Sequence, residues 1–371
     1  MTSTRRVFIR NGALAAVGTA ALPGFLTRAA FGAADAGARS KRLVVIFQRG
    51  GADGLNIVVP HGEPSYYSMR PTINIPKKSV LDLDGFFGLH PALASFQPLW
   101  RQKHLAIVHA AGSPHPTRSH FEAQDFMESA TPGIKVTDDG WLNRALRDRA
   151  PGTNADHSAF RAIALGPSLP RILSGKEAAI AVDNVNDFAV GGKNPAPNAN
   201  YPKGHFGDSL KHLAQIIKAN LGVQIAFADI DGWDHHVNEG GTQGQIANLL
   251  GDFSQAISAF WIDLGDLGED TVIVTMSEFG RTARENGSRG TDHGHANVMF
   301  VLGGPVRGGR VYGRWPGLDP SQLYEGRDLA VTTDFRIVLS EVVSRYLRNK
   351  DLKTLFPAFE GQPGQFLGLL A

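Results

Sequence analysis

One stretch of the chain, residues 277–295, concentrates side chains that bind divalent metals. It contains Glu278 and Arg281, a glycine-rich loop, and then Asp292-His293-Gly294-His295. Carboxylates and imidazoles are ligands for ions such as zinc, manganese and magnesium. β-rich runs flank the stretch, so we expect these side chains in a connection between strands. The alternative interpretation is a polar loop whose histidines only form local hydrogen bonds.

Polar residues that could bind a metal or act as a nucleophile also follow three further apolar runs. We expect these runs, over residues 41–47, 104–109 and 223–228, to be strands. Asp53 follows the first run, Ser119 the second, and Asp234 and His236 the third. The spacing of two places Asp234 and His236 on one face of an extended segment. Open α/β sheets bind ligands outside the carboxyl ends of their strands. The pattern therefore predicts one metal-binding site built from several loops.

Ser119 fits two roles. With Glu122 it forms the S-x-x-E pattern of a capping box ahead of a predicted helix. A hydroxyl at a helix N-terminus is also well placed as a nucleophile, because backbone N–H groups there stabilise negative charge. Thr117 is the rival nucleophile two residues earlier. Arg118 and Arg281 are candidates for binding the oxygens of a phosphate or sulfate group.

Composition is that of an ordinary globular protein. The 371 residues are 42% hydrophobic and 19% charged. The formal net charge of +2 gives no strong field for nucleic acid, so we expect no nucleic-acid partner. The absence of cysteine excludes disulfides and thiolate ligands. A metal must therefore bind His, carboxylate, hydroxyl or carbonyl groups.

Residues 1–36 have the features of a twin-arginine export signal. Arg5 and Arg6 lie in the motif, a short apolar stretch follows over residues 12–22, and Ala34-Asp35-Ala36 provides a small-residue cleavage site. The apolar stretch is too short and too rich in glycine and alanine for a transmembrane anchor. We expect a periplasmic or secreted protein that engages the twin-arginine translocase and has no stable membrane anchor.

Residues 37–371 are expected to form a single α/β domain. Strand-like and helix-like runs alternate, which predicts a mostly parallel central sheet with helices on both faces. A loop-rich segment around residues 131–205 contains much glycine, proline and asparagine and is expected to form a cap-like insertion.

The candidate residues lie in five short motifs, which are Arg49-Gly50-Gly51-Ala52-Asp53-Gly54-Leu55-Asn56, Thr117-Arg118-Ser119-His120-Phe121, Gly232-Trp233-Asp234-His235-His236, Ser277-Glu278-Phe279-Gly280-Arg281-Thr282 and Gly290-Thr291-Asp292-His293-Gly294-His295. Together they resemble the alkaline phosphatase superfamily, which includes the sulfatases. More closely, they resemble a bacterial, twin-arginine-exported family called domain of unknown function 1501. The resemblance covers nearly the whole mature chain and implies a three-layer, alkaline-phosphatase-like fold.

The order of residues in that superfamily implies two metal sites, one at Asp234, His236 and His295 and the other at Asp53, Asp292 and His293. Ser119 would face the second ion. Glu278 is expected nearby, as a ligand or as an acceptor for a histidine N–H group. Two cations about 4 Å apart would hold the attacking and leaving oxygens of an in-line displacement. The cofactors would be one or two divalent ions among zinc, manganese, magnesium and calcium.

These features predict an exported, metal-dependent hydrolase of a phosphate or sulfate ester, with Ser119 or a metal-bound water as nucleophile. The substrate would be a small-molecule or polysaccharide ester. The resemblance also argues against a formylglycine mechanism, because sulfatases usually make that group from cysteine. The alternative is a catalytically weak periplasmic binding or assembly protein that retains the fold and a structural metal. A hydrolase needs the Ser119 hydroxyl within about 3 Å of the metal or the reacting atom.

Overall fold

The computed structural model describes residues 41–371 except 136, 148–159, 184–187, 191–193 and 362. It also describes two short strands nearer the N-terminus, β1 (Val7–Arg10) and β2 (Ala13–Ala16). β1 pairs with β2 and with β10 (Phe188–Val190). The rest of the predicted export signal lies outside the described residues.

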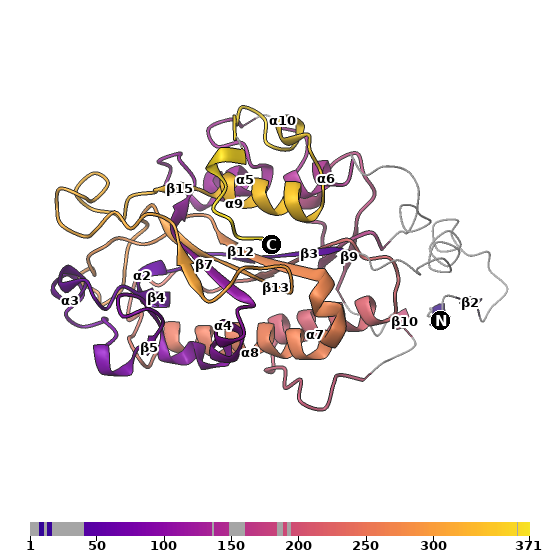
Figure 1. Cartoon of the computed structure of the whole chain (residues 1–371), viewed down its shortest axis with the longest axis horizontal. Helices are drawn as coiled ribbons and strands as arrows, with labels where there is room; N and C mark the ends of the chain where they lie inside the picture. The colour runs from indigo at the N-terminus through magenta and orange to yellow at the C-terminus, as the bar shows by residue number, and fades with distance from the viewer. Residues whose placement is uncertain are drawn as a thin grey trace, which may run out of the picture.

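A nine-stranded sheet forms the middle layer of the molecule (Figure 1). Its strands are ordered β14-β7-β13-β12-β3-β11-β8-β9, and β15 pairs with β7. β13 runs antiparallel to β12 and β7, while the other neighbouring strands described in this sheet pair in parallel. The strands are β3 (Arg42–Gln48), β7 (Leu105–Gly112), β8 (Ala162–Leu165), β9 (Ile180–Val182), β11 (Ile225–Ile230), β12 (Thr271–Ser277), β13 (Asn297–Gly303), β14 (Arg310–Tyr312) and β15 (Thr333–Asp334).

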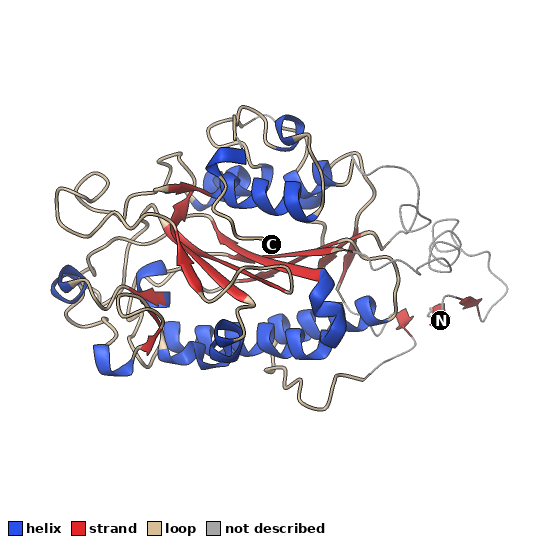
Figure 2. Cartoon of the chain, viewed as in Figure 1, coloured by secondary structure: helices blue, strands red, loops and turns tan. Residues whose placement is uncertain are grey.

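Helices cover both faces of this sheet (Figure 2), which confirms the predicted α/β fold with a mostly parallel sheet. One face carries η3 (Pro91–Phe96), α4 (Gln97–Arg101), α7 (His205–Lys218) and α8 (Gln245–Leu264). The opposite face carries α5 (His120–Ser129), α6 (Trp141–Ala145), α9 (Phe335–Glu341), the π-helix η8 (Val342–Tyr346) and α10 (Leu352–Leu355).

The central strand β3 contributes to a hydrophobic core on each face of the sheet. All seven of its residues are buried, as its nearly continuous apolar sequence predicts. Successive side chains of a strand point to opposite faces. Val44 and Ile46 accordingly belong to the core beneath α7 and α8, whereas Leu43 and Val45 belong to the core beneath α9.

Smaller elements surround the carboxyl end of β3. They are α2 (Gly54–Ile57), α3 (Pro64–Met69), η2 (Lys77–Ser79) and a small antiparallel sheet of β4 (Val58–Val59), β6 (Gly88–Leu89) and β5 (Leu81–Asp82). The remaining short helices are η5 (Arg171–Leu173), η7 (Gly265–Asp270) and η9 (Pro363–Gln365).

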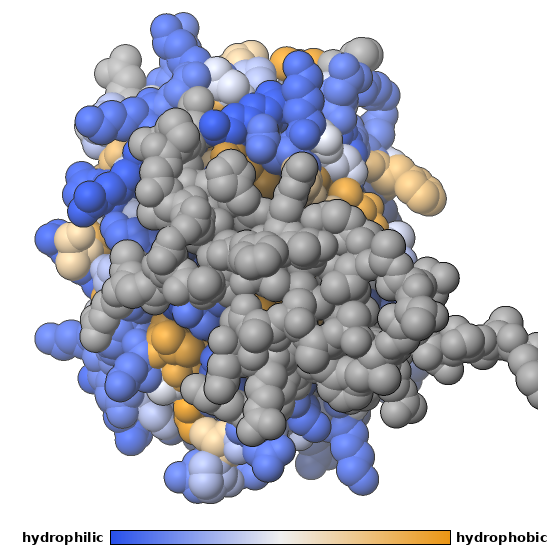
Figure 3. Space-filling model, turned by 90° about the vertical axis from the view of Figure 1, so that its right-hand side faces the viewer, coloured by the Kyte–Doolittle hydropathy of each residue, from blue (hydrophilic) through white to orange (hydrophobic). Residues whose placement is uncertain are grey.

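Part of the expected cap-like insertion belongs to the central sheet. β8 and β9 lie within residues 131–205, and they extend the sheet beyond β11. Figure 3 views the end of the molecule away from α2 and β4, where the visible side chains of described residues are mainly hydrophilic. No helix in the described part of the chain has the length and apolar character needed to cross a membrane.

Candidate metal centre

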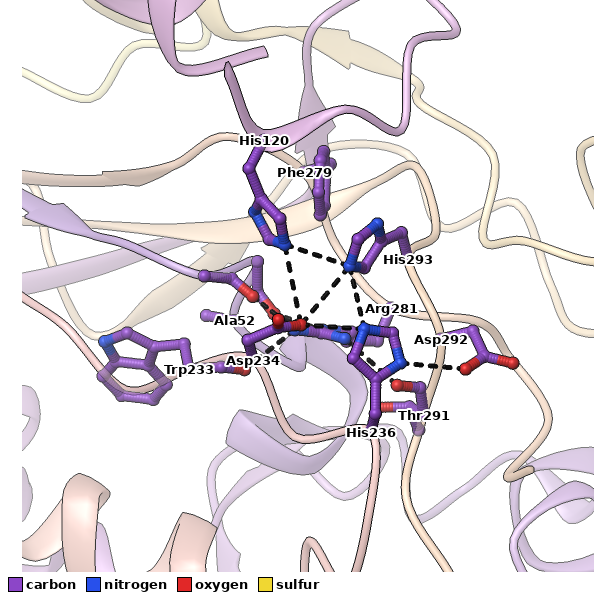
Figure 4. Close-up of polar contacts among 12 residues, drawn as sticks. Ala52, His120, Trp233, Asp234, His236, Phe279, Arg281, Thr291, Asp292 and His293 are labelled. Carbon is purple, nitrogen blue, oxygen red and sulfur yellow. Dashed lines mark hydrogen bonds and ion pairs between the residues drawn. The ribbon is translucent and has the colours of Figure 1, made fainter. Parts of the chain in front are cut away.

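Three histidines and one aspartate meet at an edge of the central sheet (Figure 4). Nε2 of His293 lies 3.0 Å from Nε2 of His120 and 2.9 Å from Nε2 of His236. Oδ1 of Asp234 lies 3.0 Å from Nε2 of His236, 3.3 Å from that of His293 and 3.6 Å from that of His120. Four atoms able to bind a metal therefore face one another.

The topology of the sheet explains why these residues meet. His120 begins α5, which follows β7, while Asp234 and His236 lie in the loop after β11. His293 lies in the connection between β12 and β13. β7, β11 and β12 share one direction and β13 runs opposite to them, so all three connections reach the same edge. In the loop after β11, His235 is buried while Asp234 and His236 face the site, as their spacing predicts.

Hydrogen bonds at Nδ1 set the tautomer of each imidazole. Nδ1 of His120 lies 2.8 Å from Oε1 of Glu278, and Nδ1 of His236 lies 2.9 Å from Oδ1 of Asp292. Nδ1 of His293 lies 2.8 Å from the carbonyl oxygen of Arg118. Carboxylate and carbonyl oxygens only accept, so each neutral ring carries its proton on Nδ1 and a lone pair on Nε2. The three lone pairs thus converge on the site.

This arrangement fits a bound cation. His120, Asp234 and His293 each offer one ligand atom, and these three atoms lie within 4.8 Å of one another. Nε2 of His236 adds a fourth atom, close to those of Asp234 and His293. Ligands bound to one zinc ion at about 2.0–2.2 Å lie roughly 3 Å apart, as these atoms do. Histidine ligands with carboxylate or carbonyl acceptors on Nδ1 are typical of metal sites.

Electrostatics favours the metal-binding form of Asp234 and His293, whereas the hydrogen bond to Glu278 raises the pKa of His120. Burial acts to raise the pKa of Asp234, but the hydrogen bond and charge of Arg281 together with the neighbouring histidines outweigh it, so that the pKa lies below its ordinary value. Nη2 of Arg281 donates to Oδ1 of Asp234 at 2.6 Å. Burial lowers the pKa of His293, which favours the neutral imidazole. Near neutral pH these two side chains are therefore ready to bind a cation.

Glu278 supports the site from the interior. Its side chain is 1% exposed, and Oε1 accepts hydrogen bonds from Nδ1 of His120, Nε2 of Gln124 and the N–H of Gly50. Burial acts to raise the pKa of Glu278, but these donors lower it. Gly50 has a φ of 119°, and a Cβ there would lie 2.7 Å from the backbone nitrogen of Asp234. Only glycine therefore fits between Glu278 and the loop of Asp234.

The structure does not bring Asp53 or His295 into this cluster. Both carboxylate oxygens of Asp53 bind the buried guanidinium of Arg70, one of them at 2.9 Å. Nε2 of His295 lies 3.0 Å from the carbonyl oxygen of Ser113. Asp292 acts as the acceptor for His236. The second ligand set implied by the resemblance, with Asp53, is therefore not assembled, because Arg70 occupies the carboxylate.

Of the residues expected to act on the substrate, Ser119 is exposed whereas Arg118 is engaged by carboxylates of the protein. Ser119 is the exposed N-cap residue of α5, but its side chain makes no capping hydrogen bond. The predicted capping box is wrong, because Glu122 accepts from Oγ1 of Thr117 at 2.8 Å instead. Arg118 pairs with Glu325 and Asp328, at 2.7 and 2.6 Å.

Arg281 also forms its hydrogen bonds within the protein. Besides Asp234, it donates to the carbonyl oxygens of Gly50, Gly51, Trp233 and Thr291. Its side chain is fully buried. The guanidinium therefore fixes the loop that carries Asp234 and has no exposed face for a substrate.

Sequence reasoning missed His120 as a candidate ligand. It lies in the Thr117–Phe121 motif, directly after Ser119. From the sequence, Ser119 is a candidate helix cap or nucleophile, and His120 has no assigned role. The available signal was a histidine at the first turn of a helix that follows a buried strand. Gln124 lies four residues later, on the same helix face, and binds the same carboxylate oxygen of Glu278.

Residues 211–348 match the model of a family described as protein of unknown function (DUF1501). The matched segment contains Asp234, His236, Glu278, Asp292 and His293, whereas His120 precedes it. The match confirms the resemblance to this family. No curated protein matches the chain.

Three solved structures illustrate what the chain resembles. The C-terminal periplasmic domain of EcEptC from Escherichia coli, in complex with Zn, is 10% identical with a TM-score of 0.39, and the match covers 72% of this chain and 74% of that one. A protein in the alkaline phosphatase superfamily from Vibrio parahaemolyticus is 10% identical with a TM-score of 0.35, over 74% of this chain and 62% of that one. The PsFucS1 sulfatase from Pseudoalteromonas sp. is 12% identical with a TM-score of 0.40, over 95% and 76%. The chain thus spans less than two thirds of the length of the Vibrio protein.

Proposed function

We propose that this chain is an exported, metal-dependent hydrolase of a phosphate or sulfate ester. The observation that carries the proposal is the convergence of three imidazole nitrogens, from His120, His236 and His293, on the carboxylate of Asp234. Each imidazole is already oriented through Nδ1, which is the arrangement that a metal-binding histidine requires. Export by the twin-arginine translocase rests on the N-terminal sequence motif.

The ligand set favours zinc among the ions expected from the sequence. Imidazole nitrogens suit zinc, whereas manganese, magnesium and calcium prefer oxygen ligands. The four residues would hold a single ion, with Glu278 and Asp292 orienting two of the histidines. When bound, the ion would supply Lewis-acid stabilisation of negative charge on the ester oxygens.

Arg327 is the cation that we assign to the anionic group of the substrate. Its Nη2 donates to the carbonyl oxygen of His293 at 2.7 Å, and 39% of the side chain is exposed. This bond holds the guanidinium at the backbone of His293, and Nε lies 3.6 Å from Oδ1 of Asp328, which leaves further N–H groups for a ligand. A planar guanidinium can bind two oxygens of a phosphate or sulfate at once.

Ser119 remains the predicted nucleophile. Its side chain makes no capping bond and is exposed beside His120, at the N-terminus of the ten-residue helix α5. Backbone N–H groups at such an end stabilise negative charge that develops on the transferred group. Attack by Oγ on phosphorus or sulfur would release the alcohol and leave a serine ester, which water then hydrolyses.

The test uses the purified mature chain, elemental analysis, and a panel of aryl phosphate and sulfate esters. We expect about one zinc ion per chain, ester hydrolysis that a chelator abolishes, and recovery on adding back zinc. His120→Ala should lower both the metal content and turnover. His205→Ala, at the start of α7, is the matched control and should change neither. Turnover that survives complete removal of metal would contradict the proposal.

Two observations favour a second candidate, a catalytically weak binding or assembly protein that retains a structural metal. Arg118 and Arg281, the arginines predicted to bind substrate, are both engaged by protein groups. Asp53 is likewise occupied by Arg70. Full metal occupancy with no turnover on any ester would support this candidate over the hydrolase.

A further inference from the structure

A groove of about 360 Å³ adjoins the candidate metal centre. Its lining includes the apolar side chains of Met69, Pro320 and Leu323 and the guanidinium groups of Arg284 and Arg327. Asp292 also lines it. The groove therefore combines an apolar wall with two guanidinium groups. The candidate metal centre gives these groove residues no joint role.

Two hydrogen bonds join this groove to the metal centre. Asp292 accepts from Nδ1 of His236 at 2.9 Å, and Arg327 donates to the carbonyl oxygen of His293 at 2.7 Å. Both residues line the groove. A ligand whose reactive group lies at the histidines can thus extend its other end directly into the groove.

The polar groups of the groove leave mainly hydrogen-bond donors available. Glu285 already accepts from the N–H and hydroxyl of Thr72 and from the N–H of Ile73. Oδ1 of Asp292 already accepts from His236 and from Asn286. These bonds occupy acceptor atoms of Glu285 and Asp292 without removing their charge, so the donors that remain available to a ligand are those of the two arginines.

Arg284 has the most available charge in this lining. It is exposed, and its guanidinium makes no hydrogen bond or ion pair with any residue that the structure describes. Arg327, in contrast, is held by His293 and lies 3.6 Å from Oδ1 of Asp328. The two arginines can therefore serve two different anionic groups, one at the metal centre and one further along the groove.

We infer that the groove binds the alcohol part of the ester and selects an alcohol that carries its own negative charge. The apolar wall of Met69, Pro320 and Leu323 would contact a ring or short alkyl body, and Arg284 would bind the second anionic group. This inference rests on the proposed function and names its substrate class, an ester of an anionic, partly apolar alcohol. A guanidinium without a protein partner is suited to a carboxylate, because it can bind both oxygens.

The experiment compares two matched phosphate esters, 4-nitrophenyl phosphate and 3-carboxy-4-nitrophenyl phosphate, and the corresponding sulfate esters. The wild-type holoprotein should favour the carboxylated ester by about tenfold in kcat/KM, as one charge-assisted contact predicts. Arg284→Gln should reduce this ratio to about one, and Arg284→Lys should keep most of it. Arg289→Gln removes a nearby exposed arginine that does not line the groove, and it should keep the full ratio.

A ratio of about one in the wild type, or a ratio that Arg284→Gln leaves unchanged, would overturn the inference. Failure of the hydrolase proposal has a different signature, because then no ester is turned over and the same compounds can be titrated by calorimetry. Tighter binding of the carboxylated ester to wild type than to Arg284→Gln would uphold the groove without the hydrolase. Equal affinities for both esters, or no binding of either, would overturn the groove as well.

Discussion

Replacing Glu278 by glutamine should weaken metal binding without unfolding the protein. The carboxylate is 1% exposed, and its Oε1 accepts from His120, Gln124 and the N–H of Gly50. A glutamine carbonyl can occupy the same position and keep all three bonds. The new amide N–H group would face Oγ of Ser277, which can accept it while donating to the carbonyl oxygen of Gln48.

The substitution removes the negative charge that raises the basicity of His120. Loss of such a partner typically lowers metal affinity by about 10–100-fold, which is about 1.4–2.8 kcal/mol of binding free energy. His120 is one of the four proposed ligands, so we expect Glu278→Gln to lie within that range. The other carboxylate partner, Asp292, orients His236 and is untouched.

The assay is a competition between the apoprotein and a chromogenic zinc chelator at fixed pH, with circular dichroism as the test of folding. Glu122→Gln is the matched control. Glu122 lies on α5, the helix that carries His120, but its carboxylate pairs with Thr117 and Lys135. It should leave zinc affinity unchanged. Wild-type affinity in a folded Glu278→Gln variant would refute the reasoning, since His120 would then not bind the metal through Nε2.

Three further predictions concern other parts of the chain. Ser119→Ala should retain metal, while turnover falls by several orders of magnitude. Because Ser119 makes no capping bond, the variant should lose well under the ~1 kcal/mol of unfolding free energy that loss of a cap usually costs. Retained hydrolysis would assign the nucleophile role to Thr117. Burial raises the pKa of Glu239, whose neighbour Asp53 is ionised, so the protonated form contributes stability at low pH that is lost as the pH rises through the raised pKa. Glu239→Gln should therefore lose less unfolding free energy than wild type as the pH rises above the ordinary glutamate pKa of 4.5 in urea titrations. Arg5→Lys with Arg6→Lys should leave the precursor in the cytoplasm on cell fractionation, and normal export of this variant would contradict the signal assignment.

Much of the fold could be predicted because its signals are local. The strands predicted over 41–47, 104–109 and 223–228 correspond to β3, β7 and β11, each of which begins within two residues of the predicted start. Hydrophobic periodicity reports which face of an element is buried, and it needs no knowledge of the partner. The antiparallel direction of β13 had no such local signal, because it depends on which strands become neighbours.

For the candidate site too, the types of residue could be predicted from the sequence, but their contacts could not. The sequence by itself determined that acidic and histidine residues follow the strands, and that Asp234 and His236 share a face. Only the tertiary structure decided which of them meet. Arg70 takes Asp53 out of the predicted ligand set, and Ser113 binds His295. Long-range contacts do this, since a side chain's hydrogen-bond partner depends on where distant segments pack.

The same reason explains His120, whose role no local pattern identified. Its Nδ1 binds Glu278, 158 residues away in the chain, and its Nε2 faces His293, 173 residues away. A histidine becomes a ligand when one nitrogen is oriented and the other is free for the metal. Composition and spacing supplied the candidate ligand types, whereas the long-range contacts of α5 with Glu278 and His293 determined which nitrogen atoms face one another.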